Sequence, residues 1–371
     1  MDFQAEDRSK LRTPAEAVRA VKNGDWVDYT SALGFPPLLD AALAARRDEL
    51  HDVKVRGNLC TGPVQVVECD TEQAHFLYHT WHCSAYERRL CDRGLCYYTP
   101  MVFRNLAWYY REFLPVNVAM ASVAPMDRHG YFSLALNGSY IDAMLDKTKR
   151  IFLEVNDRQP RGLCGSLIHI SQVDAIVEYN HDLPVLPPVQ LDEVSKTIGG
   201  LIAERIPDGA CLQLGIGAIP DATGMALKAK HDLGIHTEMF TDSMVELIEC
   251  GAVNNSKKQI HRGKTVTTFA FGSQRIYDYI DDNPAVEILP VEYVNDPDVI
   301  CQNDNMISIN AAVEVDLFGQ VCAESVGTKH MSGSGGQNDY VRGACQSRGG
   351  QRLLALPSPA QARTRRQSQP H

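Results

Sequence analysis

The sequence contains no apolar run of the ~20 residues that a membrane-spanning helix requires. Its first residues, MDFQAED, are acidic and polar, unlike a secretory signal or a transit peptide. Lys and Arg number 36 against 46 Asp and Glu, which gives a formal charge of −10. Because nucleic-acid binding needs clustered positive charge, this balance argues against nucleic acid as a main partner. We expect a cytoplasmic protein that binds neither nucleic acid nor a membrane.

Several common catalytic signatures are also missing. No Gly-x-Ser-x-Gly elbow of a serine hydrolase occurs. The eleven cysteines are scattered and odd in number, and Cys91 and Cys96 have no partners at zinc-finger spacing, so we expect reduced thiols. The segment 79–83 (HTWHC) offers possible metal ligands, but no second cluster completes a four-ligand site, and structural roles are favoured. We therefore expect no metal.

What is present is an alternation of strand and helix patterns over 371 residues, enough for about two domains. A nearly continuous apolar run at 116–124 is typical of a strand covered on both faces. Three prolines within 183–190 mark the best domain boundary. The prediction is an α/β fold of two similar domains. We expect strands at 53–57 (the first), 116–124, 150–155, 210–214, 265–271 and 352–356, a hairpin at 308–321, and helices at 14–22, 37–49, 140–149, 191–205, 220–231, 274–280 and 338–345.

Two glycine-rich turns are candidate ligand loops. Gly215-Ile216-Gly217 follows a predicted strand and opens a helix, so its amides face whatever lies at the helix N-terminus. A dinucleotide site needs a third glycine where this chain has Pro220, so a plain tight turn remains the alternative. The second turn, 332–337 (SGSGGQ), suits a loop pressed against a ligand or an oxyanion. It lacks the lysine of a phosphate-binding P-loop.

Glu238 lies on a short apolar segment, 233–242 (LGIHTEMFTD). A structural salt bridge is the ordinary role of such a residue. However, Ile235, Met239 and Phe240 would exclude water from at least one side of the carboxylate. A desolvated carboxylate has a raised pKa and a more reactive anion, so Glu238 is also a candidate nucleophile.

The order of these motifs resembles the acetyl-CoA hydrolase/transferase family of family I CoA-transferases, and in particular its 4-hydroxybutyrate and butyryl-CoA:acetate branch. The resemblance covers roughly residues 30 to 357. It rests on LGIGAIP at 214–220, GIHTEMF at 234–240, GS at 272–273, YVNDP at 293–297, QNDNMISIN at 302–310, DLFGQV at 316–321, GSGGQ at 333–337, PMDRHG at 125–130 and SLIHIS at 166–171.

The resemblance implies two domains with mostly parallel sheets and an active site between them. The catalytic glutamate would be Glu238, the oxyanion donors the backbone N–H groups of Ile216 and Gly336, and an asparagine near the acyl site Asn295. CoA would bind at four glycines, Gly215, Gly217, Gly333 and Gly335. Because CoA is a substrate of the reaction, no cofactor is expected. The partners would be a short-chain acyl-CoA and a carboxylate, and a homo-oligomer, dimer or tetramer, is a family-level expectation.

The implied reaction is ping-pong transfer of CoA from a short-chain acyl-CoA to acetate through a glutamyl-CoA thioester. Two alternatives stay open: hydrolysis of acyl-CoA by the same intermediate, and a catalytically silent CoA-binding protein. The silent alternative arises because family members continue beyond residue 357, whereas residues 358–371 are basic, polar and without apolar periodicity. We expect domains at 1–187 and 188–357, the second incomplete, and a disordered tail at 358–371.

Overall fold

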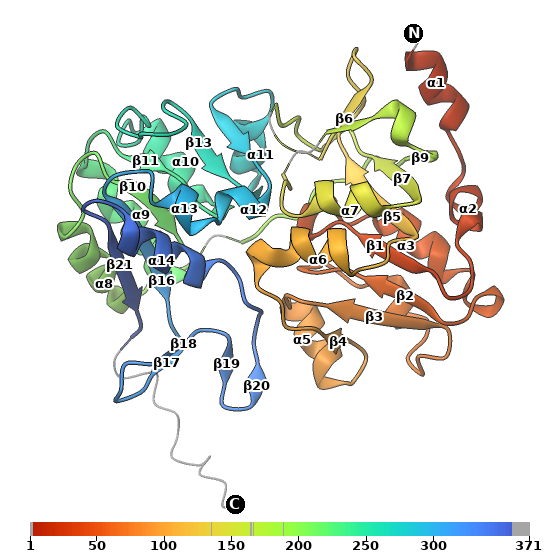
Figure 1. The fold of residues 1–371 in the computed structure, drawn as a ribbon, viewed down its shortest axis with the longest axis horizontal. Coiled ribbons are helices and arrows are strands. Elements are labelled where there is room, and N and C mark those ends of the chain that lie inside the picture. Colours follow the sequence, from red (N-terminus) through yellow and green to blue (C-terminus); the bar gives the residue numbers. More distant parts are fainter. Residues whose placement is uncertain (1–2, 135, 164, 166, 188, 358–371) are drawn as a thin grey trace, which may run out of the picture.

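The computed structural model describes residues 3–357 except residues 135, 164, 166 and 188. Two α/β halves lie side by side, the first coloured red to yellow and the second green to blue (Figure 1). The predicted class, α/β with mostly parallel sheets, is confirmed. The tail expected at 358–371, the boundary residue Pro188 and Ser166 of the resembling motif lie outside the described residues. The domain limits therefore stay a prediction.

The first half is built on a seven-stranded parallel sheet of order β4-β3-β2-β1-β5-β7-β9. Every residue of β5 is buried, as its apolar run predicted. The strand order changes direction between β1 and β5, and in open α/β sheets ligands bind at the carboxyl ends of the strands near such a point. The strands are β1 (Trp26–Tyr29), β2 (Val53–Arg56), β3 (Phe76–Thr80), β4 (Tyr97–Tyr98), β5 (Val118–Val123), β7 (Arg150–Val155) and β9 (Ala175–Glu178). The helices are α1 (Phe3–Lys10), α2 (Pro14–Ala17), α3 (Pro37–Ala44), α4 (Gln65–Glu68), α5 (Ala85–Asp92), α6 (Leu106–Glu112) and α7 (Ile141–Lys147), and β6 (Tyr131–Ser133) pairs with β8 (Leu167–His169).

The prediction that residues 53–57 form the first strand is wrong, because β1 precedes them. Its sequence, WVDY, contains Asp28, and a charged residue hides the pattern of a buried strand. Asp28 is fully buried, and Arg56 on β2 donates to both of its carboxylate oxygens at 2.8 Å. The hydroxyl of Tyr110 donates a third hydrogen bond at 2.6 Å. Because the charge is fully paired, the strand tolerates it in the core.

The second half is built on a four-stranded parallel sheet of order β11-β10-β16-β21. Two short parallel pairs, β12–β14 and β13–β15, lie beside it. The strands are β10 (Cys211–Leu214), β11 (Gly234–Ile235), β12 (Met239–Phe240), β13 (Thr265–Thr267), β14 (Phe269–Ala270), β15 (Val286–Ile288), β16 (Met306–Ala311) and β21 (Gln351–Ala355). The helices are α8 (Glu193–Glu204), α9 (Ala218–Ala226), α10 (Asp242–Glu249), α11 (Gln274–Ile280), α12 (Val291–Val294), α13 (Pro297–Ile300) and α14 (Gln337–Gln346).

Two predictions for the second half are corrected. The single strand expected at 265–271 is two strands, β13 and β14, which pair with different neighbours. The hairpin expected at 308–321 is shorter: β17 (Glu314–Val315) pairs with β18 (Val321–Cys322), whereas residues 306–311 form the parallel strand β16. Apolar content identified both segments as strands, but pairing partners depend on residues far away in sequence.

The two halves share their cores. Leu33 and Leu136 of the first half belong to the apolar cluster of the second, and Val291 belongs to a cluster of the first. The segment after β18 forms a hairpin of β19 (Ser325–Val326) and β20 (Lys329–His330), which projects from the lower side of the second half and lies near α5 (Figure 1). Among the described residues, no helix is long and apolar enough to cross a bilayer.

Candidate active site

Glu238 lies between β11 and β12, beyond the carboxyl end of β11, which is the edge strand of the four-stranded sheet. Its backbone carbonyl accepts hydrogen bonds from the Thr267 hydroxyl at 2.8 Å and the Thr268 amide at 3.0 Å. These bonds fix the backbone, so the position of the carboxylate is determined by the second half of the protein. The side chain is half-buried.

The carboxylate of Glu238 is held by two of the predicted site residues. The side-chain amide of Asn295, which is fully buried just after α12, donates to Glu238 Oε2 at 2.6 Å. The backbone N–H of Gly336, the residue preceding α14, also donates to this carboxylate. A Cβ at position 336 would lie 2.1 Å from Glu238 Oε2 and 2.4 Å from Asn295 Nδ2. Only glycine fits between these two side chains.

The second glycine turn joins this site to the first half. A Cβ at Gly335 would lie 3.4 Å from Glu238 Oε1 and 3.7 Å from His82 Cε1. A Cβ at Gly333 would lie 2.4 Å from the carbonyl oxygen of Trp81. The turn is therefore pressed between Glu238 on one side and the segment after β3 on the other.

Burial raises the pKa of Glu238 to about 7. Hydrogen bonds from the Asn295 side chain and the Gly336 amide lower this pKa, whereas the nearby carboxylate of Asp339 raises it further. With this pKa, about half of the Glu238 carboxylates are ionised at neutral pH. A carboxylate that is ionised but poorly hydrated has the properties of an activated nucleophile.

The first glycine turn lies at the same edge of the sheet, since β10 is the parallel neighbour of β11. The Gly215 amide donates to Ile309 at 2.8 Å, and Gly217, with φ +112°, precedes α9. Ile216 between them is 63% exposed, and its amide donates to no acceptor within the part of the chain that the structure describes. The turn thus has a free N–H for an incoming ligand, although no described contact joins it to Glu238.

Sequence reasoning missed a group of charged residues around the site. Arg104, from the first half, lies 3.4 Å from both Asp296 and Asp339. Asp339 is buried in the first turn of α14, and burial raises its pKa to about 6. Asp296 follows Asn295, and Asp339 lies three residues after Gly336, so their closeness in sequence to predicted site residues could have identified them. Their basic partner, Arg104, lies in the other half of the chain.

His82, which sequence reasoning considered as a possible metal ligand, lies beside the second glycine turn instead. Burial and the neighbouring His330 and Arg88 lower its pKa to about 4, so its imidazole is neutral. Within residues 3–357, gaps aside, no group of three or more His, Cys, Asp or Glu side chains could hold a metal ion.

Comparison with known proteins connects this geometry to a family. The profile of the acetyl-CoA hydrolase/transferase N-terminal domain matches residues 1–187, and that of the C-terminal domain matches residues 272–369. The butyryl-CoA:acetate CoA-transferase of Anaerostipes caccae is 41% identical over 96% of this chain and 82% of its own length. The chain belongs to the acetyl-CoA hydrolase/transferase family. The family predicted from the motif order is thereby confirmed.

Solved structures of similar proteins have the same fold as this acetyl-CoA hydrolase/transferase family member. RipA of Yersinia pestis superposes with a TM-score of 0.89 at 38% identity, covering 97% of this chain and 84% of its own. The 4-hydroxybutyrate CoA-transferase of Porphyromonas gingivalis superposes with a TM-score of 0.81 at 33% identity, covering 98% and 84%.

The raised pKa of Glu238 predicts the pH dependence of this family member. If Glu238 is the nucleophile, only its ionised form reacts, so kcat/KM should fall about tenfold per pH unit below about pH 7 and level off above it. Replacing Asn295 with Ala removes a hydrogen bond that lowers the pKa, so the acidic limb should move to higher pH. A pH–rate profile of wild type and Asn295→Ala, with a thermal melt to confirm folding, checks this. An acidic limb at the same pH in both proteins would contradict it.

Proposed function

We propose that this protein transfers CoA from a short-chain acyl-CoA, of the butyryl- or 4-hydroxybutyryl-CoA type, to acetate. The observation that carries the proposal is the half-buried Glu238 carboxylate, with its pKa near 7, between the Asn295 amide and the Gly336 N–H. The names of the similar proteins support the substrate class.

The reaction follows from a carboxylate nucleophile and backbone donors. Glu238 attacks the thioester carbonyl, the C–S bond breaks, and an acyl-glutamyl anhydride and CoA thiolate form. The thiolate then attacks the glutamyl carbonyl, which releases the first carboxylic acid as its anion and leaves a Glu238–CoA thioester. Acetate reverses these steps and leaves as acetyl-CoA, so the kinetics are ping-pong.

Each residue of the site has a role in these steps. Asn295 orients Glu238 and limits the rise of its pKa. The N–H groups of Ile216 and Gly336 would stabilise the tetrahedral oxyanions, and Gly215, Gly217, Gly333 and Gly335 would let the chain approach CoA closely. The carboxylate supplies the nucleophile, so the proposed reaction uses CoA as a substrate and no resident cofactor.

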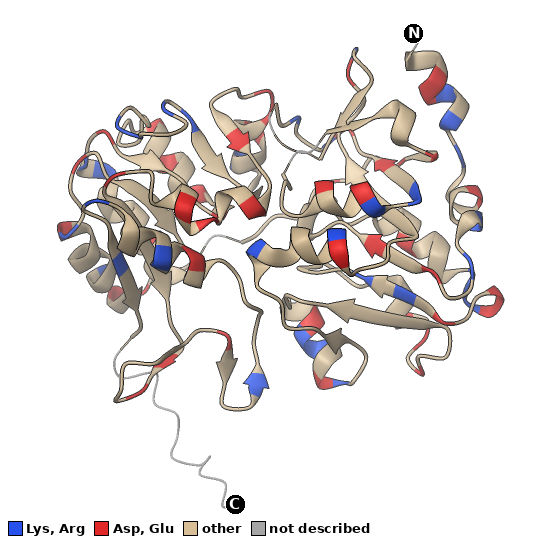
Figure 2. Ribbon diagram, in the orientation of Figure 1, with Lys and Arg blue, Asp and Glu red and all other residues tan. Residues whose placement is uncertain are grey.

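The setting of the enzyme is also proposed. All ten described cysteines are free, which is typical of the cytoplasm. Basic and acidic residues are scattered over both halves in the view of Figure 2, which agrees with the absence of nucleic acid as a partner. Assembly as a homo-dimer or homo-tetramer follows the family expectation, and analytical ultracentrifugation tests it.

Borohydride trapping tests the function. The protein is mixed with butyryl-CoA without acetate, treated with borohydride, digested and analysed by mass spectrometry. Reduction of Glu238 to the alcohol is expected in wild type and not in Glu238→Gln. Glu204→Gln changes an exposed glutamate at the end of α8 and should label like wild type. Failure to label wild type would overturn both transfer and hydrolysis.

The alternative of hydrolysis is separated by the acceptor. A transferase loses butyryl-CoA only when acetate is present, whereas a hydrolase loses it in water alone. Loss of the thioester at the same rate with and without acetate would contradict transfer.

A further inference from the structure

Three cysteines gather beside the second glycine turn and have no part in the proposed reaction. Cys83 precedes α5, Cys91 lies in its last turn, and Cys96 precedes β4. The sulfurs of Cys83 and Cys91 are 3.8 Å apart, and the Cys96 thiol also hydrogen-bonds Cys91. Cys83 and Cys96 are buried, whereas Cys91 is half-buried and so accessible to a small reagent.

We propose that Cys83 and Cys91 form a disulfide in the presence of a peroxide, and that this bond displaces the second glycine turn and stops catalysis. The loss of catalysis rests on the proposed function, whereas the formation of the bond does not.

The surroundings make Cys91 the sulfur that reacts first. Hydrogen bonds from the Cys83 and Cys96 thiols lower its pKa, burial opposes this, and His330 lowers it further while Asp92 raises it. The hydrogen bond to Cys91 and burial raise the pKa of Cys83, Glu87 adds to this rise and Arg88 opposes it, so the Cys83 thiol stays protonated as the donor. A thiolate, not a thiol, attacks a peroxide.

The chemistry balances with hydrogen peroxide as the oxidant. The Cys91 thiolate attacks one oxygen, the O–O bond breaks, and hydroxide leaves as water after taking a proton, which gives a sulfenic acid. The Cys83 sulfur then attacks the Cys91 sulfur, the S–O bond breaks, and a second water leaves. Two electrons pass from the two sulfurs to one peroxide.

Forming the bond must draw Cys83 and Cys91 together. The sulfurs must approach from 3.8 Å to about 2 Å, a shift of about 1.8 Å. The N-terminus of α5 is held by the Ser84 capping box, in which Ser84 and Glu87 satisfy each other's amides. Any part of the closure that rotation of the two side chains does not supply therefore falls on the helix and on the Cys83 backbone.

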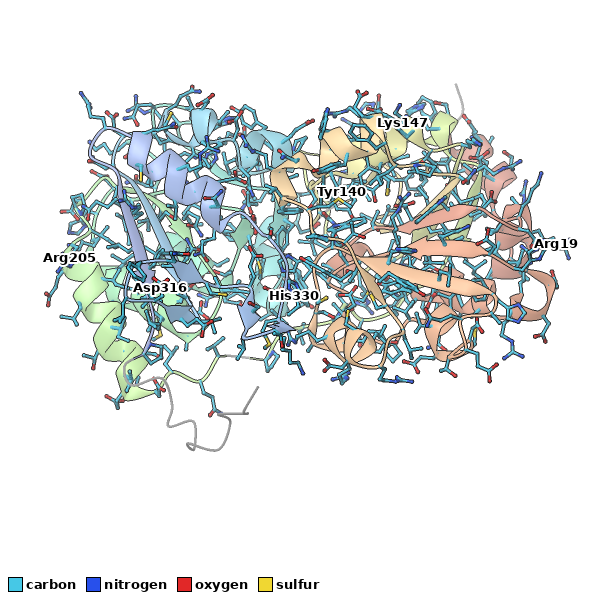
Figure 3. The ribbon with its side chains drawn as sticks, turned by 60° about the horizontal axis from the view of Figure 1, so that its bottom comes forward. Arg19, Tyr140, Lys147, Arg205, Asp316 and His330 are labelled. Carbon is cyan, nitrogen blue, oxygen red and sulfur yellow. The ribbon has the colours of Figure 1, made fainter. Side chains whose placement is uncertain are left out.

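The Cys83 backbone is hydrogen-bonded to the second glycine turn. The Cys83 amide donates to the Ser332 carbonyl at 3.0 Å. Gly333, which follows Ser332, packs so closely against the Trp81 carbonyl that a Cβ would not fit. Arg88 of α5 donates to the Met331 carbonyl at 2.8 Å. Figure 3 places His330 where the second half meets the first, and its ring lies 4.0 Å from that of Tyr98.

A shift of this turn reaches the nucleophile within a few residues. Gly335 and Gly336 lie against the Glu238 carboxylate, and Gly336 donates to it. Oxidation should therefore change the position of an oxyanion donor, a kind of change that costs ~10²-fold or more in kcat.

The test treats the full chain with a small excess of hydrogen peroxide, blocks free thiols, digests with trypsin and maps disulfides. Trypsin cuts after Arg88, Arg89 and Arg93, so Cys83, Cys91 and Cys96 fall on three peptides. The Cys83 peptide also contains Cys60 and Cys69, so fragmentation spectra assign the sulfur. We expect a Cys83–Cys91 bond and a loss of activity of ~10²-fold or more that dithiothreitol reverses.

Variants make the outcome decisive. Cys91→Ser and Cys83→Ser should keep their activity after peroxide. The Cys91→Ser variant is expected to fold, because Cys91 is only half-buried. Cys250→Ser, an exposed cysteine at the end of α10, should stay as sensitive as wild type. A Cys91–Cys96 bond, no bond, or a Cys83–Cys91 bond without loss of activity would overturn the inference. Absence of transferase activity before oxidation would instead overturn the proposed function.

Discussion

Replacing Glu238 with Gln is expected to lower kcat for CoA transfer by about 10³-fold or more, which corresponds to ~4 kcal/mol of lost transition-state stabilisation. Glutamine has nearly the same shape and can still accept the hydrogen bond from Asn295. Its neutral amide is a poor nucleophile and forms no anhydride with an acyl group. Steady-state assays with butyryl-CoA and acetate measure the effect.

The control for this variant is Glu204→Gln, which makes the same chemical change on an exposed helix end. It should keep the kcat of wild type. Thermal melts of both variants separate a loss of chemistry from a loss of folding. Activity of Glu238→Gln within tenfold of wild type would show that another group is the nucleophile.

Replacing Gly336 with Ala is expected to lower kcat by ~10²-fold or more, the second largest effect. The new Cβ would lie 2.1 Å from Glu238 Oε2 and 2.4 Å from Asn295 Nδ2, so it must push the nucleophile or its partner aside. It would also move the N–H that donates to Glu238. The loss should be in kcat more than in KM, since the change lies at the reacting carboxylate.

Gly200→Ala is the matched control, because a Cβ at this position of α8 meets no atom within 4 Å. It should leave kcat unchanged and, as a helix interior position, stabilise the fold slightly. If Gly336→Ala is as active as Gly200→Ala, then the turn does not contact the reacting carboxylate in the working enzyme.

The burial of Glu238 was the part of the candidate site that local sequence predicted best. Apolar neighbours around Glu238 indicated a desolvated carboxylate, and the structure gives it a pKa near 7 through burial. Asn295 and Gly336 were assigned by resemblance alone. Local sequence could not assign them, because their contact with Glu238 joins the ends of α12 and α14 to β12.

Charge pairs between distant segments were the hardest to predict. Arg104 lies far from Asp339 in sequence, and nothing near either residue identifies its partner. Asp28 hid the strand β1 for the same reason, since its partner Arg56 is on another strand. The cysteine cluster was missed because spacing alone does not show that the side chains of Cys83, Cys91 and Cys96 meet.

The β19–β20 hairpin, which precedes the second glycine turn, also has a consequence for folding order. Arg88 and Met331, whose contact fixes this hairpin on α5, are 243 positions apart in the chain. We expect contacts of such long range to form late, after each sheet has assembled, because closing the long loop between them costs conformational entropy. During synthesis the first half can fold while the turn is still unmade. Refolding followed by circular dichroism and by activity should therefore show secondary structure returning before catalysis.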